Sequence, residues 1–193
     1  MYRFLQKAAA RPAEVPETAS STAARNVVEQ LELHFSEHYA PLYRFLRASG
    51  AGEATAEDLA QDAFLKLHRH LVERKPTPNV RAWLFKVSYR MWIDRQREER
   101  RESSADGTSW DSWQEALADP SPGAEHEILA QERRDWLLAA IGKLSQMERQ
   151  CLHLRADGLQ YREIAEVLNV GYWPVVEAVR RALEVLGEQA HGR

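Results

Sequence analysis

The sequence predicts an all-α fold of two small helical domains joined by an acidic linker. Apolar residues recur at steps of three or four in every periodic segment, which is the spacing of a stripe along one face of a helix. No segment alternates apolar and polar residues as a half-buried strand does. The apolar periodicity also fails in the middle of the chain and resumes after Ile128, which favours two domains over one.

Composition limits the functions that the chain can have. With 193 residues, 44% of them hydrophobic and 28% charged, the chain can bury one modest core or two small ones. The net charge of -3 excludes a uniformly cationic surface but allows cationic segments. The single cysteine, Cys151, predicts a buried thiol in a reducing compartment. Because we recognise neither a membrane span nor a secretory signal, we expect a cytoplasmic protein without direct membrane insertion.

The first predicted domain covers residues 26–101 and follows a flexible arm, residues 1–25, rich in Ala, Pro, Ser, Thr and Glu. Its first stripe runs from Val28 to Leu46, and Pro41 is expected to kink this helix or break it into a pair.

Two further helices complete this domain. Thr55 and Asp58 have the spacing of a capping box and predict the start of a helix whose apolar stripe runs from Ala60 to Leu71. After the break at residues 75–78, a third stripe from Val80 to Met91 continues into an arginine-rich end.

Charge is segregated along the chain at the end of this domain. Basic residues outnumber acids from Asn79 to Arg101, whereas residues 102–132 contain acids and no Lys or Arg. Residues 102–125 are therefore predicted to be a linker. Two tryptophans in it, Trp110 and Trp113, need apolar cover, and we expect this part to pack on one of the domains.

The second predicted domain covers residues 126–190 and begins with a helix from Ile128 to Leu144. Ser145 and Glu148 form a second capping-box pattern, and Asp157-Gly158 predicts the end of the helix that starts there.

The segment from Tyr161 to Val170 has the pattern of a helix-turn-helix. Ala165 is small where the two helices would cross, Asn169 suits a left-handed turn, and Val170 and Val175 are expected to hold the second helix against the first. Pro174 is tolerable near the first turn of a helix. An ordinary helical hairpin is the alternative, and the combined pattern favours DNA binding.

Two segments of the first domain carry a family resemblance. Ala56–Leu67 and Arg81–Val87 resemble the two signature segments of the extracytoplasmic-function sigma factors, and the resemblance extends from about Val27 to Leu186. In that family a promoter-melting domain, a linker and a helix-turn-helix domain follow one another, as predicted here. Arg181-Ala182-Leu183 further resembles the iron-starvation branch. The resemblance implies a non-enzymatic factor that binds RNA polymerase core and promoter DNA and has an anti-sigma partner.

The resemblance implies that the second helix binds polymerase core. Its buried stripe leaves several side chains available to the coiled-coil clamp of the largest subunits, namely Asp58, Leu59, Gln61, Asp62 and Lys66. The alternative is a solvated amphipathic surface.

The third helix and the preceding loop form the first candidate DNA site. By resemblance, the loop from Arg74 to Asn79 captures a flipped base of the minus-ten element. The helix interleaves cations with aromatic residues, a mixture suited to phosphates and unpaired bases. Its candidate residues are Lys86, Tyr89, Arg90, Trp92, Arg95 and Arg97, with Phe85 a further aromatic. Core packing is the alternative for the aromatic residues and is expected for Trp83.

The recognition helix of the helix-turn-helix departs from the family pattern. Family members place polar or basic residues on its exposed face, whereas this chain has Tyr172, Trp173, Val176, Glu177 and Ala178, with Arg180 and Arg181 further on. Glu177 could accept a hydrogen bond from cytosine and Val176 could contact a thymine methyl group. Phosphate attraction is expected to be feeble. The two aromatic residues could instead pack on the protein or on an anti-sigma partner.

The sequence does not favour a metal site or an enzymatic function. His34 and His38 stand one helical turn apart, but Glu37 is expected to point off their face, so we predict surface histidines and no metal. The glycine-loop and hydrolase motifs are absent from the sequence, and no cofactor or small-molecule substrate is expected.

Two alternatives to a sigma factor stay open. A conventional dimeric regulator would use the helix-turn-helix alone, which leaves the basic and aromatic third helix unexplained. A degenerate sigma-like adaptor would bind polymerase or an anti-sigma factor without selecting promoters, and the atypical recognition helix keeps this possibility open.

Overall fold

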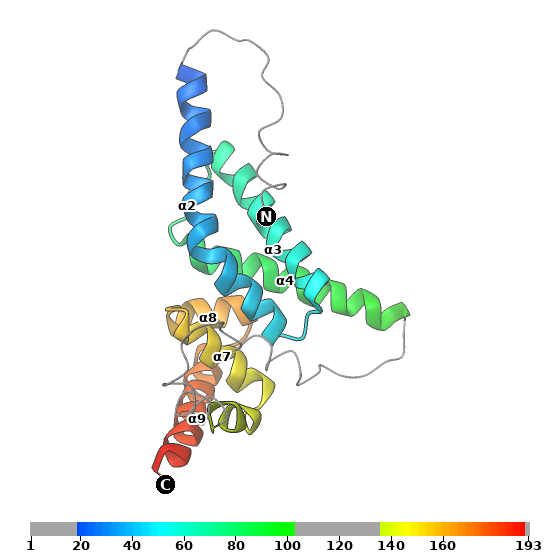
Figure 1. The fold of residues 1–193 in the computed structure, drawn as a ribbon, viewed down its shortest axis with the longest axis vertical. Coiled ribbons are helices and arrows are strands. Elements are labelled where there is room, and N and C mark those ends of the chain that lie inside the picture. The colour runs from blue at the N-terminus through cyan, green and yellow to red at the C-terminus, as the bar shows by residue number, and fades with distance from the viewer. Residues whose placement is uncertain (1–18, 103–135, 192–193) are drawn as a thin grey trace, which may run out of the picture.

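The computed structural model describes residues 19–102 and 136–191, and within these ranges the regular structure is entirely helical (Figure 1). The all-α prediction is confirmed. Residues 136–142 form a further helical segment. The other helices are α2 (Ala19–Ala48), α3 (Glu53–Val72), α4 (Val80–Glu102), α7 (Gln146–Ala156), α8 (Tyr161–Leu168) and α9 (Tyr172–His191).

Helix α2 runs unbroken through Pro41. Leu42, Phe45 and Leu46 follow the proline and are fully buried, so packing holds the helix where one backbone hydrogen bond is lost. The helix also starts at Ala19, inside the range predicted as a flexible arm. The remainder of that arm lies outside the described residues.

Helix α3 begins two residues before the predicted capping box. Its N-cap is Gly52 rather than Thr55, and the amide of Ala56 donates to the carbonyl of Gly52 at 2.8 Å. The capping box at Thr55 and Asp58 is therefore wrong. Gly50, with a φ of 98°, turns the chain tightly after α2 and lets the helix start earlier. The predicted stripe is confirmed, since Ala60, Ala63, Phe64 and Leu67 are buried.

The predicted boundaries of α7 are confirmed. Ser145 Oγ accepts from the amide of Glu148 at 3.3 Å, and the Glu148 carboxylate accepts from the amide of Ser145 at 2.8 Å. Asp157 caps the other end, and Gly158 follows with a φ of 86°. A Cβ at Gly158 would lie 2.7 Å from an Arg81 guanidinium nitrogen, so this turn closely approaches α4.

The helix-turn-helix geometry forms between α8 and α9. Asn169 adopts the left-handed conformation expected of the turn, with φ 54° and ψ 48°. Val175 is fully buried as predicted, and Pro174 falls in the first turn of α9. Val170 is 38% exposed, so its predicted packing role is wrong, because the turn points this side chain outward.

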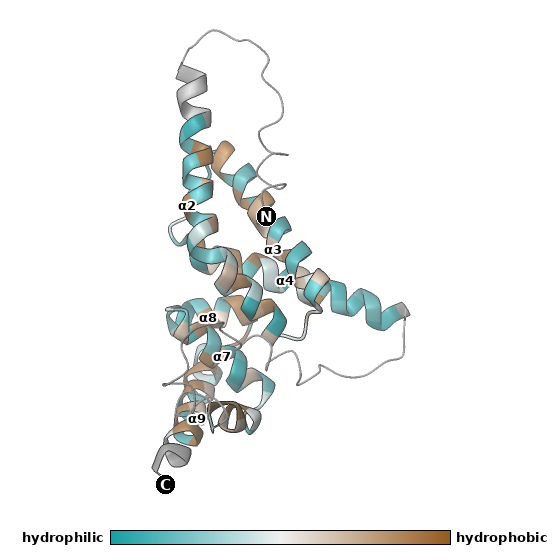
Figure 2. Ribbon diagram, viewed as in Figure 1, coloured by the Kyte–Doolittle hydropathy of each residue, from teal (hydrophilic) through white to brown (hydrophobic). Residues whose placement is uncertain are grey.

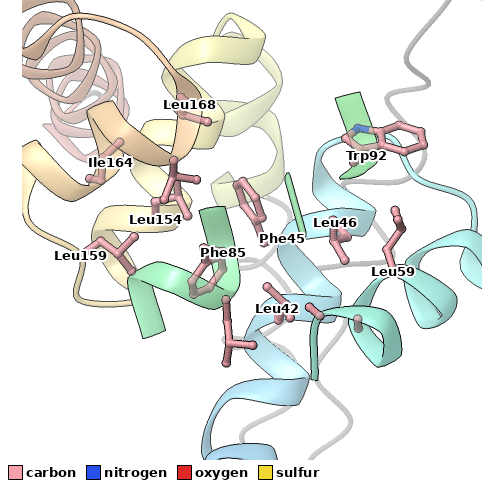
Figure 3. Packing of buried hydrophobic residues seen from close by; sticks show 14 of the residues in the cluster. Leu42, Phe45, Leu46, Leu59, Phe85, Trp92, Leu154, Leu159, Ile164 and Leu168 are labelled. Carbon is pink, nitrogen blue, oxygen red and sulfur yellow. The ribbon is translucent and has the colours of Figure 1, made fainter. Parts of the chain in front are cut away.

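The helices of the two predicted domains share one hydrophobic core. Figure 3 shows Phe45 and Phe85 between the leucines of α2 and α3 on one side and Leu154, Leu159 and Ile164 on the other. Cys151, fully buried as predicted, belongs to the same cluster. Separate apolar stripes in the sequence thus meet in a continuous interior, because each half alone covers little apolar surface.

Two predictions about the middle of the chain fall outside the described residues, namely the acidic linker and the packing of Trp110 and Trp113. Among the described helices, none combines the length and the apolar character needed to cross a membrane. Figure 2 shows that hydrophilic residues dominate the outer end of α4.

Candidate polymerase and nucleic-acid interface

The predicted polymerase-binding face lies on the outer side of α3. Asp58, Asp62 and Lys66 are exposed, and Gln61 is half-buried. Leu59 is only 5% exposed and packs in the same cluster as Leu46 and Trp92 (Figure 3). Its assignment to a partner surface is wrong, because α3 contacts both α2 and α4 and buries a wider stripe than one neighbour would require.

An apolar residue on this face was missed by sequence reasoning. Leu65 is 43% exposed and lies next to Lys66, one turn after Gln61 and Asp62. The signal was present in the sequence, since Leu65 falls outside the buried stripe that contains Phe64 and Leu67. A large apolar side chain among charged groups is typical of the centre of an interface.

The aromatic residues of α4 point mainly inward. Trp92 is 5% exposed, and its indole Nε1 donates to the carbonyl of Ser49 at 3.1 Å. Phe85 is 1% exposed and meets Phe45 edge to face, with the ring centroids 5.3 Å apart. The prediction that Trp92 and Phe85 stack on DNA bases is therefore wrong, because both side chains are buried in the core. The reason is that the stripe facing α2 and α3 includes these positions as well as Leu84.

Tyr89 lies at the margin of the core. Its hydroxyl contacts Gln150 Oε1 of α7 at 3.5 Å, and burial raises the pKa of the phenol above its usual range. In contrast, Arg90, Arg95 and Arg97 are exposed along the outer part of α4. Exposed carboxylates of the same helix pair with two of them, Glu99 with Arg95 at 3.3 Å and Asp94 with Arg97 at 3.6 Å. The predicted cationic surface exists, with part of its charge compensated.

The loop before α4 ends at a residue with two roles. Asn79 Oδ1 accepts from the amide of Ala82 at 3.1 Å, which caps α4, while Asn79 Nδ2 donates to Glu163 Oε1 at 2.5 Å. Arg74, at the other end of the loop, has a φ of 52° and an exposed side chain. Trp83 packs against the core and lies 5.1 Å from the ring of His70, as its predicted core role requires.

Helix α8 lies directly against this loop and α4. Lys86 Nζ is 2.7 Å from Glu166 Oε2, and the hydrogen bond from Lys86 lowers the pKa of the Glu166 carboxyl. Arg81 donates to the carbonyl of Asp157 at 2.9 Å. A cleft of about 270 Å³ between loop and α8 is lined by Pro76, Thr77, Pro78, Asn79, Ala82, Trp83, Lys86, Glu163 and Glu166.

The recognition helix presents aromatic rather than basic side chains. Trp173 is 75% exposed, whereas Tyr172 is 41% exposed and its ring meets that of Tyr161 edge to face, with the centroids 6.4 Å apart. Val176 is half-buried, and Ala178, 6% exposed, faces inward rather than outward as expected. The helix therefore presents fewer side chains to DNA than the sequence suggested.

The Glu177 carboxylate forms ion pairs with both arginines of this helix, Arg180 and Arg181. Its Oε1 lies 2.6 Å from Arg180 Nη2 and accepts from Arg181 Nε at 2.9 Å. The Arg180 hydrogen bond, with those of Arg181, lowers the pKa of Glu177 to about 2. Arg180 also contacts Glu184. These contacts compete with base reading by Glu177 and with phosphate binding by Arg180 and Arg181.

A group of possible metal ligands lies on α2. Ligand atoms of His34, Glu37 and His38 all fall within 4.8 Å of one another, so Glu37 does not point away from the histidines as expected. The prediction of surface histidines is also wrong for His38, which is 7% exposed. Burial, together with the nearby Arg81 guanidinium, lowers the pKa of His38 below its usual range.

The first half of the chain matches a known domain. The family model described as sigma-70 region 2 matches residues 34–102, from the middle of α2 to the end of α4. This range contains the exposed face of α3, the loop before α4 and the cationic surface.

Curated sigma factors are similar to most of the chain. ECF RNA polymerase sigma factor SigM of Bacillus subtilis is 27% identical over 131 residues, which are 67% of this chain and 76% of that protein. RNA polymerase sigma factor CnrH of Cupriavidus metallidurans is 26% identical over 151 residues, 76% of this chain and 79% of that protein.

Two solved structures share the fold. Sigma factor RpoE in complex with the anti-sigma factor NepR, from Bartonella quintana, has a TM-score of 0.59 at 22% identity and aligns with 88% of this chain and 99% of its own. CnrH in complex with the cytosolic domain of CnrY has a TM-score of 0.52 at 21% identity, covering 87% of this chain and 92% of its own.

Proposed function

We propose that the chain is an extracytoplasmic-function sigma factor, which binds RNA polymerase core and directs transcription from a specific set of promoters; its similarity to sigma-70 region 2 and to curated ECF sigma factors supports this. Members of this family are transcription initiation factors without catalytic activity of their own. The observation that carries the proposal is the region 2 match over residues 34–102, because this range includes both the polymerase-facing helix and the promoter-melting surface that the proposal requires.

Helix α3 supplies the polymerase contact in this proposal. Asp58, Asp62 and Lys66 form an exposed charged surface around Leu65. Charged groups give such a contact its orientation and association rate, and a central apolar side chain gives it affinity.

Promoter DNA contacts α4 and the preceding loop. Exposed Arg90, Arg95 and Arg97 attract phosphates, and Arg74 and Asn79 stand at the ends of the base-capturing loop. The helix-turn-helix contributes less, because Glu177 compensates Arg180 and Arg181. We therefore expect promoter selection to depend mainly on the melting domain.

Two finer assignments belong to the same proposal. The structure of RpoE contains the anti-sigma factor NepR, and that of CnrH contains the cytosolic domain of CnrY. We infer that this chain also has an anti-sigma partner, in the cytoplasm, where the polymerase is found. Membership of the iron-starvation branch is suggested by Arg181-Ala182-Leu183 alone. Transcripts that depend on this factor should then increase when iron is depleted, and an unchanged set would contradict the branch assignment.

Run-off transcription tests the proposal. Core polymerase, a promoter library and the full-length chain should give discrete transcripts that core polymerase alone does not. Core binding without selective transcripts would favour the sigma-like adaptor. Specific binding to duplex DNA without any binding to core would favour a conventional regulator.

A further inference from the structure

We propose that the free chain is held closed by α8, whose carboxylates occupy the DNA-binding groups of α4 and its preceding loop. This inference rests on the proposed function for the identity of that surface. The inference goes beyond the proposed function because it assigns two acids of the helix-turn-helix domain, Glu163 and Glu166, as internal competitors of promoter DNA.

The contacts coincide with the candidate DNA site. Asn79 ends the base-capturing loop, and its amide, which would otherwise be free to contact a base, donates to Glu163 at 2.5 Å. Lys86, the first cation of α4 in that site, pairs with Glu166 at 2.7 Å and keeps only 30% of its side chain exposed. Carboxylates thus take the positions that a phosphate or a base acceptor would take in a DNA complex.

The packing of α8 beside the loop also restricts the access of a DNA base to the loop. The cleft beside Pro76, Thr77 and Pro78 has Glu163 and Glu166 as its opposite wall. A flipped base that entered this cleft would meet two carboxylates, which repel the negatively charged strand. Displacement of α8 removes both obstacles at once.

Glu163 is fixed in its position by the local structure of α8. Its second carboxylate oxygen, Oε2, accepts from the amide of Gln160 at 2.8 Å and completes the capping box that starts the helix. Because one oxygen caps α8 and the other accepts from Asn79, the start of α8 and the start of α4 are joined by a single side chain. Glutamine in its place can keep the cap while it loses the charge.

The closed form has an apolar part and a polar part. The apolar part is the shared core around Phe45, Phe85 and Leu154 (Figure 3). It favours closure in the free chain, and polymerase must supply contacts that replace it. The polar part is exposed, with 66% of the Glu166 side chain accessible, so it is weak enough for DNA to displace.

The first measurement tests closure without DNA. Amine-reactive labelling of the full-length chain, read by mass spectrometry, should modify Lys86 several-fold more slowly than Lys66, which is exposed on α3. In the double variant Glu163→Gln, Glu166→Gln, labelling of Lys86 should accelerate while that of Lys66 stays constant. Equal labelling of the two lysines in the unaltered chain would overturn the closed state.

The second measurement tests competition. The full-length double variant should bind a single-stranded DNA oligonucleotide of mixed sequence about five- to tenfold more tightly than the unaltered chain, because fewer molecules are closed. Glu29→Gln with Glu32→Gln removes the same charge from an exposed part of α2 and should change affinity less than twofold. Equal gains in both variants would reduce the effect to net charge and overturn the proposed competition. Absence of run-off transcription with slow labelling of Lys86 would reject the proposed function while leaving the closed state supported.

A separate observation carries a second inference: we infer that His34, Glu37 and His38 form a binding site for a divalent transition metal such as Zn²⁺ or Ni²⁺. Their ligand atoms lie within 4.8 Å of one another on consecutive turns of α2. His38 Nε2 faces the Glu37 carboxylate at 3.6 Å, and the two imidazoles stack with centroids 5.7 Å apart. In addition, His34 Nδ1 is buried without a hydrogen-bond partner among the described residues.

Imidazole and carboxylate ligands suit these metals, and three protein ligands leave a position for water. Isothermal titration of the full-length chain with Zn²⁺ and Ni²⁺ should show one site, and His34→Gln should weaken it at least tenfold. His68→Gln on α3 is the matched control and should leave the affinity unchanged. Failure of the unaltered chain to bind either metal, or an equal loss in both variants, would overturn this site.

Discussion

The indole Nε1 of Trp92 donates to the carbonyl of Ser49 at 3.1 Å and thereby ties α4 to the end of α2. Gln150 of α7 donates to the Ser49 hydroxyl at 3.3 Å, so the same residue receives contacts from both halves of the chain. Trp92 therefore supports the fold where the sequence had suggested a base-stacking residue.

Trp92→Ala should destabilise the folded chain by about 3 to 5 kcal/mol, because it leaves a cavity and removes a buried hydrogen bond. Trp173→Ala is the matched control and should change stability by less than about 0.5 kcal/mol, since that side chain is 75% exposed. Urea unfolding of both variants measures the difference. A small loss for Trp92→Ala would place this residue outside the core.

Asp62→Arg should weaken binding to polymerase core and leave the fold intact. Asp62 is exposed, so the change in stability should stay within about 0.5 kcal/mol. Competition for core against a labelled sigma factor measures the affinity, with the exposed Glu29→Arg as control. Unchanged affinity for Asp62→Arg would remove this residue from the interface.

Glu177→Gln should strengthen DNA binding by the helix-turn-helix, because it releases Arg180 and Arg181 from their shared carboxylate. In the full-length chain, the slope of log affinity against log salt should become steeper by roughly one for each phosphate gained. Fluorescence titration of labelled promoter duplex at several salt concentrations reports this slope. An equal slope in Glu177→Gln and in the unaltered chain would show that loss of this carboxylate frees no arginine to bind phosphate.

Cys151 should be inert toward thiol reagents in the folded chain. Burial first, with Glu148 contributing, raises the pKa of its thiol to about 11. Compared with a thiol of ordinary pKa, the reactive thiolate is roughly a hundredfold scarcer near neutral pH. Reaction with a chromogenic disulfide should be slow in buffer and fast in denaturant. Fast reaction of the native chain would contradict the burial of this side chain.

Local sequence patterns determined the elements that depend on near neighbours. The capping box at Ser145, the left-handed Asn169 and the stripe of α3 were all predictable, because each depends on residues within a few positions of one another. The helix-turn-helix was predictable for the same reason. The exposed face of α3 followed from its stripe, apart from Leu59, where a second packing neighbour widened the buried surface.

Tertiary structure decided what the sequence left open about α4 and α8. Periodicity identifies a buried face but not which helix covers it, so Trp92 and Phe85 could be read equally as core or as base-stacking residues. The pairing of Lys86 with Glu166 joins residues 80 positions apart, and nothing in either local segment indicates it. The sequence alone determined the helices and the family resemblance. Only the packing of α8 on α4 decided which of the candidate DNA-binding groups are engaged within the chain, because long-range contacts select among faces that local patterns leave equivalent.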